Sequence, residues 1–202
     1  MNVAHNSTTL DDRGGDWLAS LVFVAIFTLV CGVAYPVVST LAGGVLFPHQ
    51  ATGSLIEREG RIVGSALVAQ PFADARYFRP RPSAANYDPK AASGSNLASS
   101  NPALRERVAK DSADVAAREN VPASEIPSDL VTASGSGLDP DISPASARLQ
   151  APRVAQARGM PVADVEAAIH AHTRKPTLGV FGAARVNVLA LNLALDAKQG
   201  TK

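Results

Sequence analysis

The sequence predicts an α+β protein in which a single N-terminal transmembrane helix precedes one domain of mixed helices and strands. Two observations support this prediction. Residues 17–56 contain no Asp, Glu, Lys or Arg, and the first half of this stretch is almost wholly apolar. The rest of the chain alternates β-branched stretches, helix-start signals and loops of small polar residues. Residues 57–202 are long enough for one domain with a core of its own.

The apolar stretch predicts a transmembrane helix over residues 17–38. About 20 apolar residues in a helix cross the roughly 30 Å hydrocarbon layer of a bilayer, and this segment lacks the polar stripe of a surface helix. Trp17 and Tyr35 lie near its ends, where amphipathic rings favour the membrane–water interface. Pro36 predicts a kink or an end. Residues 39–56 are therefore interpreted as an apolar connector, either interfacial or helical beyond a kink.

A cleaved signal peptide is the alternative to this anchor. Such peptides have a basic start and an apolar region of about 7–15 residues. Here the start carries Arg13 against three Asp, and the apolar run is longer. The residues before Cys31 also fit a lipoprotein site poorly. The sequence therefore favours an uncleaved anchor, although cleavage near Ala42 stays open.

The basic residues that flank the helix indicate its orientation. Lys and Arg close to the membrane mark the cytoplasmic side. Arg13 lies on the N-terminal side, and no Lys or Arg follows the helix until Arg58. We therefore expect a short cytoplasmic tail at residues 1–16 and an extracytoplasmic domain at residues 57–202, in a single-pass protein of the plasma (inner) membrane.

Composition excludes several function classes. The formal net charge is +1, with no basic patch typical of nucleic-acid binding and no polybasic run directly after the anchor. Cys31 is the single cysteine, which excludes a disulfide within the chain and a metal site built on several thiolates. The anchor carries no charge of the kind that marks an ion pathway.

The first elements of the domain follow from local signals. β-branched residues with short alternation predict a strand within residues 60–68. Asn101 as a cap and Pro102 at the first position predict a helix over residues 102–119. Its apolar face would consist of Leu104, Val108 and Val115. Residues 130–133 are interpreted as a short strand or a helix edge.

The C-terminal part is predicted to be mainly helical. Ser143 and Pro144 predict a second capped helix, which Pro152 should break or kink and Gly159 should end. Pro161 opens a further helix, and residues 177–182 are turn-like. Residues 186–198 predict a last helix, although their alternation also allows a strand.

Motifs for catalysis are missing from the sequence. It contains neither a Gly-x-Ser-x-Gly pentapeptide nor a phosphate loop, because the glycines of residues 134–137 are not followed by a lysine. Asp139, Asp141 and Ser143 could collect a cation, but the same residues are typical of turns and caps. His170 and His172 are two residues apart, which does not place them on one face of a helix. These features favour an accessory subunit.

The order of short motifs along the chain is more specific than any single motif. They lie at residues 32–36, 46–55, 64–67, 77–83, 93–97, 100–104, 129–140, 142–145, 151–159 and 185–196. In this order they resemble the KdpC family, the C subunits of Kdp-type potassium-transporting P-type ATPases. The resemblance covers nearly the whole chain from the anchor onward.

The resemblance implies a role in high-affinity, ATP-driven potassium uptake. In such complexes a channel-like subunit binds potassium and a P-type pump subunit forms an aspartyl phosphate. This chain lacks the Asp-Lys-Thr-Gly-Thr phosphorylation motif, so no catalytic residue, metal or directly bound cofactor is expected here; the complex handles ATP and potassium. The family is regarded as a catalytic chaperone that raises the pump's ATP affinity. An extracytoplasmic domain could do this only allosterically.

The small-residue loops at residues 93–101 and 133–144 are the predicted contact surface for these partner subunits, together with the end of the anchor. They are polar, rich in turns and poor in core residues, yet they carry the resemblance. The candidate interface residues are Tyr35, Pro36, Ser95, Asn96, Asn101, Ser134, Gly135, Ser136, Gly137 and Asp139. The alternative is that these residues serve only internal turn geometry.

Two other function classes stay open at this point. A membrane-anchored exported hydrolase would need a nucleophile paired with a base. Its loose candidates are Ser134, Ser136, His170 and His172. An anchored ion- or solute-binding module is the other class.

Overall fold

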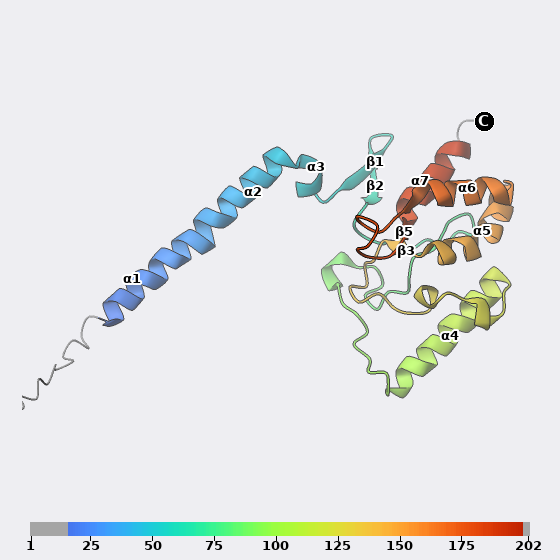
Figure 1. Ribbon diagram of the computed structural model, residues 1–202, viewed down its shortest axis with the longest axis horizontal. Helices are drawn as coiled ribbons and strands as arrows, with labels where there is room; N and C mark the ends of the chain where they lie inside the picture. The colour runs from blue at the N-terminus through green and yellow to red at the C-terminus, as the bar shows by residue number, and fades with distance from the viewer. Residues whose placement is uncertain (1–15, 200–202) are drawn as a thin grey trace, which may run out of the picture. The chain divides into compact units, whose positions relative to one another are not determined.

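The computed structural model describes residues 16–199. The chain forms two compact units that divide between Thr52 and Gly53 (Figure 1). The first unit is a long apolar helix, and the second contains short sheets surrounded by helices. The predicted α+β class is therefore confirmed. The predicted tail at residues 1–16 lies outside the described residues, apart from Asp16.

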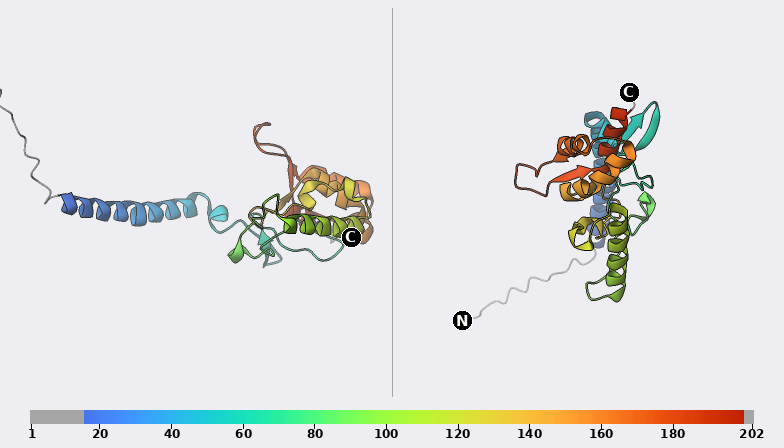
Figure 2. Two further views of the ribbon diagram at one scale, coloured as in Figure 1. Left: turned by 90° about the horizontal axis from the view of Figure 1, so that it is seen from below. Right: turned by 90° about the vertical axis from the view of Figure 1, so that its right-hand side faces the viewer.

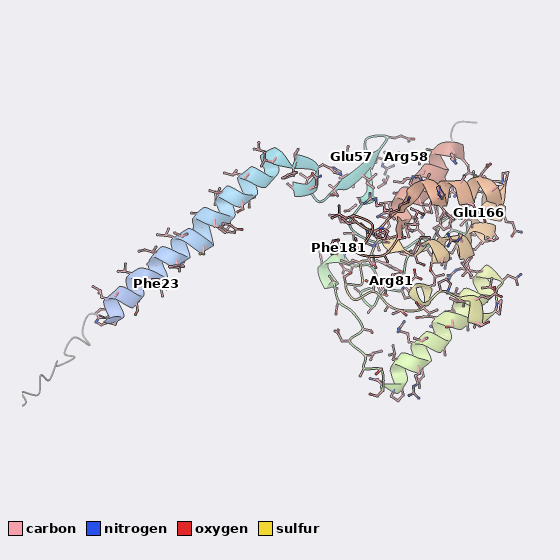
Figure 3. All side chains as sticks on the ribbon, in the orientation of Figure 1. Phe23, Glu57, Arg58, Arg81, Glu166 and Phe181 are labelled. Carbon is pink, nitrogen blue, oxygen red and sulfur yellow. The ribbon has the colours of Figure 1, made fainter. Side chains whose placement is uncertain are left out.

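The first unit consists of α1 (Asp16–Leu29), a π-helical turn η1 (Val30–Ala34), α2 (Tyr35–Leu46) and a short α3 (Pro48–Ala51). Its apolar side chains, such as Phe23 in Figure 3, are exposed. Within residues 16–199, one helix is long and apolar enough to cross a membrane, and it runs over the 30 residues Trp17–Leu46.

The apolar helix passes Pro36, which we expected to kink or end it. It ends at Leu46 rather than at Val38, so much of the predicted connector is helical. The π-turn before Pro36 gives the physical reason. Proline lacks the N–H for the usual α-helical bond and its ring crowds the preceding turn. Here the Tyr35 N–H donates to the Val30 carbonyl, five residues back, which widens the turn just before the proline.

The second unit begins with a hairpin of β1 (Leu55–Arg58) and β2 (Arg61–Ser65). The predicted strand at residues 60–68 covers β2, whereas β1 was not predicted. Glu59 and Gly60 both have positive φ, the pattern of the tight turns that join antiparallel strands. Pairing with β2 therefore makes a strand of residues 55–58, which begin within the uncharged stretch.

Helix α4 (Pro102–Glu119) has the predicted bounds. The Asn101 side chain accepts a hydrogen bond from the Ala103 N–H at 3.0 Å, as expected for a cap. Val115 on the predicted apolar face is buried. Short 3₁₀ segments flank this helix in the chain: η2 (Pro89–Ala91), η3 (Ala123–Glu125) and η4 (Ser128–Leu130). Residues 130–133, predicted as a short strand or a helix edge, begin with Leu130, the last residue of η4, and continue as a turn without a strand.

The second sheet has the strand order β3-β5-β4 and is antiparallel throughout. Its strands are β3 (Asp141–Ile142), β4 (Thr173–Arg174) and β5 (Arg185–Asn187). The last helix, α7 (Val188–Gln199), follows β5 directly. Residues 186–198, predicted as one helix with a strand as alternative, therefore divide between the two.

Helix α5 (Pro144–Arg158) continues through Pro152, so the predicted break was wrong. Pro152 and Arg148, whose carbonyl the proline leaves without its helical donor, both lie on the exposed face. Water can therefore solvate that carbonyl. The predicted ends are confirmed: Ser143 caps the helix through the Ser146 N–H at 3.0 Å, and Gly159 is left-handed.

The core of the second unit lies where α5, α6 (Val162–His172) and α7 pack against the β3-β5-β4 sheet (Figure 1). It combines many small residues with a few large ones, and α4 packs against the outer side of α5. The buried members are Phe78, Ile142, Ala147, Ala151, Val154, Ala155, Val165, Ala168, Ile169, Val186, Val188, Leu191 and Leu195.

Among the described members of this core cluster, Phe78 alone comes from an extended segment without a sheet partner. Two side-chain amides pair the backbone of Phe78 and of Arg79, which follows it. Asn192 of α7 accepts from the Phe78 N–H at 2.8 Å and donates to the Phe78 carbonyl at 3.0 Å. Gln150 of α5 accepts from the Arg79 N–H at 2.9 Å and donates to the Arg79 carbonyl at 3.2 Å. These amides satisfy backbone groups that would otherwise be buried without partners.

Replacing Gln150 with alanine should therefore destabilise the fold by about 2–4 kcal/mol, because both Arg79 backbone groups lose their partner. Gln156 lies on the exposed face of the same helix, and Gln156→Ala should change stability by no more than about 0.5 kcal/mol. Chemical unfolding of the full chain in detergent measures both. Equal losses for the two variants would contradict the pairing role of Gln150.

Candidate partner-binding groove

The extended segment at residues 77–83 fixes the position of the loop at residues 133–144. The Ser134 N–H donates to the Pro82 carbonyl at 3.0 Å. The Ser83 hydroxyl donates to the Gly137 carbonyl at 2.6 Å and accepts from the Ala85 and Tyr87 N–H groups. One serine therefore connects the turn that follows the segment to the second small-residue loop.

The two small-residue loops pack against each other, backbone to backbone. A Cβ at Gly94 would lie 2.8 Å from the Gly135 carbonyl oxygen, and a Cβ at Gly137 would lie 2.7 Å from the Ser93 carbonyl oxygen. Gly137 also has a φ of +72°, which side chains rarely adopt. These glycines are needed for close approach within the chain. The structure thus supports internal turn geometry for part of the predicted surface.

The predicted interface residues separate into structural and accessible groups. Ser134 and Gly137 are buried, and Asn101 caps α4. Ser136 and Gly135 are exposed at the tip of the second loop. The remaining candidates are half-buried Ser95 and Asp139, exposed Asn96, and Tyr35 and Pro36 on the exposed surface of the first unit.

A groove of about 590 Å³ lies beside the second loop, and we call it the aspartate groove. The loop, the start of η4, the extended segment and residues 183–185 at the start of β5 contribute to it. It is lined by Arg81, Pro127, Ser128, Asp129, Asp139, Asp141, Ile142, Ser143, Ala183, Ala184 and Arg185. Figure 3 labels Arg81, which contributes one of its charges.

Each carboxylate of the aspartate groove already has partners within the chain. Arg81 Nη1 lies 2.8 Å from Asp139 Oδ2, and Arg185 Nε lies 3.1 Å from Asp141 Oδ2. Asp129 accepts from the Ser143 N–H at 2.7 Å and from the Ser146 hydroxyl at 2.5 Å, at the start of α5. Among residues 16–199 no group of three acidic, His or Cys side chains could hold a metal ion.

The environment of Asp141 changes its pKa. Burial raises the pKa of Asp141 above its ordinary value, and the negative charge of Asp139 raises it further, while Arg185 opposes the shift. The groove combines three carboxylates with two guanidinium groups.

Sequence reasoning did not find Arg81, Arg185 or Asp129 as members of this site. Each lies within a motif that carried the resemblance. No local spacing rule joins them, because the groove brings together segments far apart in the chain. The order of the motifs was therefore the one available signal. It marked the stretches that contain these three residues, but it did not indicate that they line a groove.

The loose hydrolase candidates do not form a nucleophile–base pair among the described residues. The Ser134 and Ser136 hydroxyls lie 3.1 Å apart and accept from the Gly137 and Leu138 N–H groups. His172 Nδ1 lies 2.9 Å from the Ala168 carbonyl oxygen in its own helix. His170 is exposed on α6.

Comparisons with a family model and with individual known proteins give the same family. A family model described as "KdpC: K+-transporting ATPase, c chain" matches residues 17–197. A potassium-transporting ATPase KdpC subunit of Xanthomonas oryzae is 54% identical over 191 residues, which cover 94% of this chain and 91% of the relative. Proteins of the same name from Shewanella putrefaciens (56% over 167 residues; 83% and 84% covered) and Caulobacter vibrioides (54% over 182 residues; 89% and 91%) are also similar.

The close packing of the loops predicts different effects for two neighbouring glycines. Gly137→Ala should destabilise the fold by more than about 2 kcal/mol, because a left-handed residue and two close contacts are both affected. Gly135→Ala should be nearly neutral, since nothing lies within 4 Å of its added Cβ. Unfolding free energies of the full chain measure the difference. The same effect at both positions would show that the loops do not pack in this way.

The environment of Asp141 predicts a pH dependence. A raised pKa means that the folded chain holds this proton more tightly than the unfolded chain, so the contribution of Asp141 to stability falls as pH rises above 3.8. Asn cannot titrate. The unfolding free energy of Asp141→Asn minus that of the wild type should therefore increase as pH rises from 3.8 through the raised pKa of Asp141 in the folded chain.

Asp74→Asn is the control of opposite sign. Hydrogen bonds from Arg76 lower the pKa of Asp74, so its stabilising contribution is lost as pH falls below 3.8. The unfolding free energy of Asp74→Asn minus that of the wild type should therefore decrease as pH rises toward 3.8. A difference for Asp141→Asn that is constant with pH, or that follows the Asp74 trend, would contradict the assignment.

Proposed function

The chain belongs to the KdpC family, the c chains of K⁺-transporting ATPases, and from this premise we propose that it is a non-catalytic accessory subunit of a high-affinity, ATP-driven potassium uptake complex. The observation that carries the proposal is the extent of the family match. Residues 17–197 include both the apolar helix and nearly all of the second unit. Both units therefore take part in the proposed role.

The catalytic step belongs to a partner in this proposal. The chain lacks the phosphorylation motif of P-type pumps, and the aspartates of its groove are paired with arginines or helix-cap hydroxyls. The proposed partners are the ATP-hydrolysing pump subunit and the potassium-binding, channel-like subunit. The role of this chain is assembly and stability of their complex.

We propose a single-pass topology in the plasma (inner) membrane, with the N-terminus in the cytoplasm and the domain at residues 57–202 outside it. Support comes from the apolar helix Trp17–Leu46 and from Arg13 on its N-terminal side. Cys31 and Gly32 lie in the π-turn and are exposed, as are Tyr35 and Pro36. Small residues let a partner's transmembrane helix approach closely at this point.

The partner surface of the domain is the aspartate groove together with the exposed tips of the two loops. Ser95, Asn96, Gly135 and Ser136 form the accessible part of these tips. Buried Ser134, Gly137 and the cap Asn101 hold the loops in position rather than touch a partner. The arginine–aspartate pairs of the groove suit a hydrogen-bonding segment of another protein.

An effect on ATP affinity must then be allosteric. An extracytoplasmic domain cannot contact a cytoplasmic nucleotide, so it can act only by binding one conformational state of the complex more tightly than another. In this proposal the chain is a catalytic chaperone that favours the state of the pump subunit with high ATP affinity. No nucleotide contact of its own is required.

Purification of the full chain, tagged at its C-terminus, from its native membrane tests the proposal. The pump and channel-like subunits should co-purify in mild detergent. Gly135→Trp should lower their yield by at least about tenfold, which corresponds to roughly 1.4 kcal/mol of binding energy. Ala113→Trp on the exposed face of α4 is the matched control and should leave the yield unchanged.

Two results would contradict these proposals separately. A wild-type chain that purifies alone would overturn the accessory-subunit role. Normal recovery of both partners with a folded Gly135→Trp variant would leave the subunit role intact and refute the loop tips as the interface.

A further inference from the structure

The segment between β4 and β5 exposes a cluster of large apolar side chains. Leu178, Val180 and Phe181 are 85%, 77% and 66% exposed. Figure 2 shows this segment as an orange-red loop that stands away from the rest of the second unit, and Figure 3 labels Phe181 on it. Single exposed apolar residues are common, but a contiguous group on one projecting loop indicates a binding surface.

The loop has a defined turn that holds the apolar side chains at its tip. The Val180 N–H donates to the Thr177 carbonyl at 3.2 Å, and the Thr177 N–H donates to the Phe181 carbonyl at 2.8 Å. Leu178 and Gly179 both have positive φ. Tight hairpin turns with positive φ at both central residues favour Asn at the first of them. Asn tolerates positive φ better than most residues with a side chain. A leucine therefore occupies a position where turn geometry alone would favour a polar residue.

Basic residues surround the base of this tip. Residues 173–185 contain Arg174, Lys175 and Arg185 but no Asp or Glu. Arg185 pairs with Asp141, whereas Arg174 and Lys175 have no ion-pair partner among the described residues and are exposed. An apolar tip with a basic base matches the two layers of a bilayer surface, acyl chains below and anionic headgroups above.

We propose that the Leu178–Val180–Phe181 tip inserts at the boundary between the headgroups and the acyl chains of an anionic phospholipid bilayer. The projecting shape favours lipid over a protein partner, because a narrow tip can enter a fluid surface without a complementary pocket. Arg174 and Lys175 would then contact lipid phosphates. The domain would have a second, reversible contact with the membrane besides its anchor.

The length of the connecting chain makes this contact feasible. Fewer than ten residues separate the end of α2 at Leu46 from the start of β1 at Leu55. Even a fully extended chain of this length spans only roughly 30 Å. A domain held by so short a connector stays close to the membrane that contains its anchor. The inference therefore rests on the anchored topology proposed above, but it does not depend on the identity of the partner subunits.

Tryptophan quenching in nanodiscs tests the proposal on the full chain. Trp17 is the single tryptophan, so the wild type reports anchoring by itself. A Trp17→Phe, Phe181→Trp variant reports the tip, and Trp17→Phe, Val180→Trp is a second reporter. Trp17→Phe, Ala109→Trp on the exposed face of α4 is the matched control. The probe is phosphatidylglycerol-containing lipid brominated along its acyl chains.

Both tip reporters should be quenched about as strongly as Trp17, and the α4 control should not be quenched. Arg174→Gln with Lys175→Gln should weaken tip quenching in anionic lipid and abolish the difference between anionic and zwitterionic lipid. An unquenched tip beside a quenched Trp17 would overturn the inference and leave the anchor intact. Tip quenching that disappears in the assembled complex would overturn it in favour of a protein contact.

Discussion

The fold of the second unit depends on the side-chain amides that pair the backbone of residues 78 and 79. Asn192 and Gln150 supply donors and acceptors that a neighbouring strand would supply in a sheet. Through them Phe78 enters the core without leaving buried backbone groups unsatisfied. Arg153 adds bonds to the Ala75 and Tyr77 carbonyls while its charge pairs with buried Glu119 of α4. One extended segment thus joins α4, α5 and α7.

The proposed partner surface depends on this arrangement. Because the extended segment is fixed, Pro82 and Ser83 can hold the second small-residue loop, and Arg81 can pair with Asp139 at the edge of the groove. The close glycine contacts then leave only the loop tips exposed. Polar residues that looked like a single surface therefore have two roles: some build the loops, and others are available to a partner.

Local signals in the sequence were sufficient where a helix begins and ends within its own residues. Asn101 with Pro102, and Ser143 with Gly159, marked the ends of α4 and α5 correctly. The prolines did not end their helices, because a π-turn before Pro36 and the solvent-facing side of α5 at Pro152 accommodate them. The amide pairing of Phe78 and the aspartate groove join distant segments, so no local pattern could predict them.

The central claim is that a chain without a catalytic site controls ATP use from a distance. The most direct test is the apparent KM for ATP of the potassium pump reconstituted with and without this chain, beside ATP binding to the chain alone. We predict that removal of the chain raises the KM within the roughly 5–150-fold range of allosteric couplings, and that the isolated chain does not bind ATP. An unchanged KM, or saturable ATP binding to the isolated chain, would contradict the account.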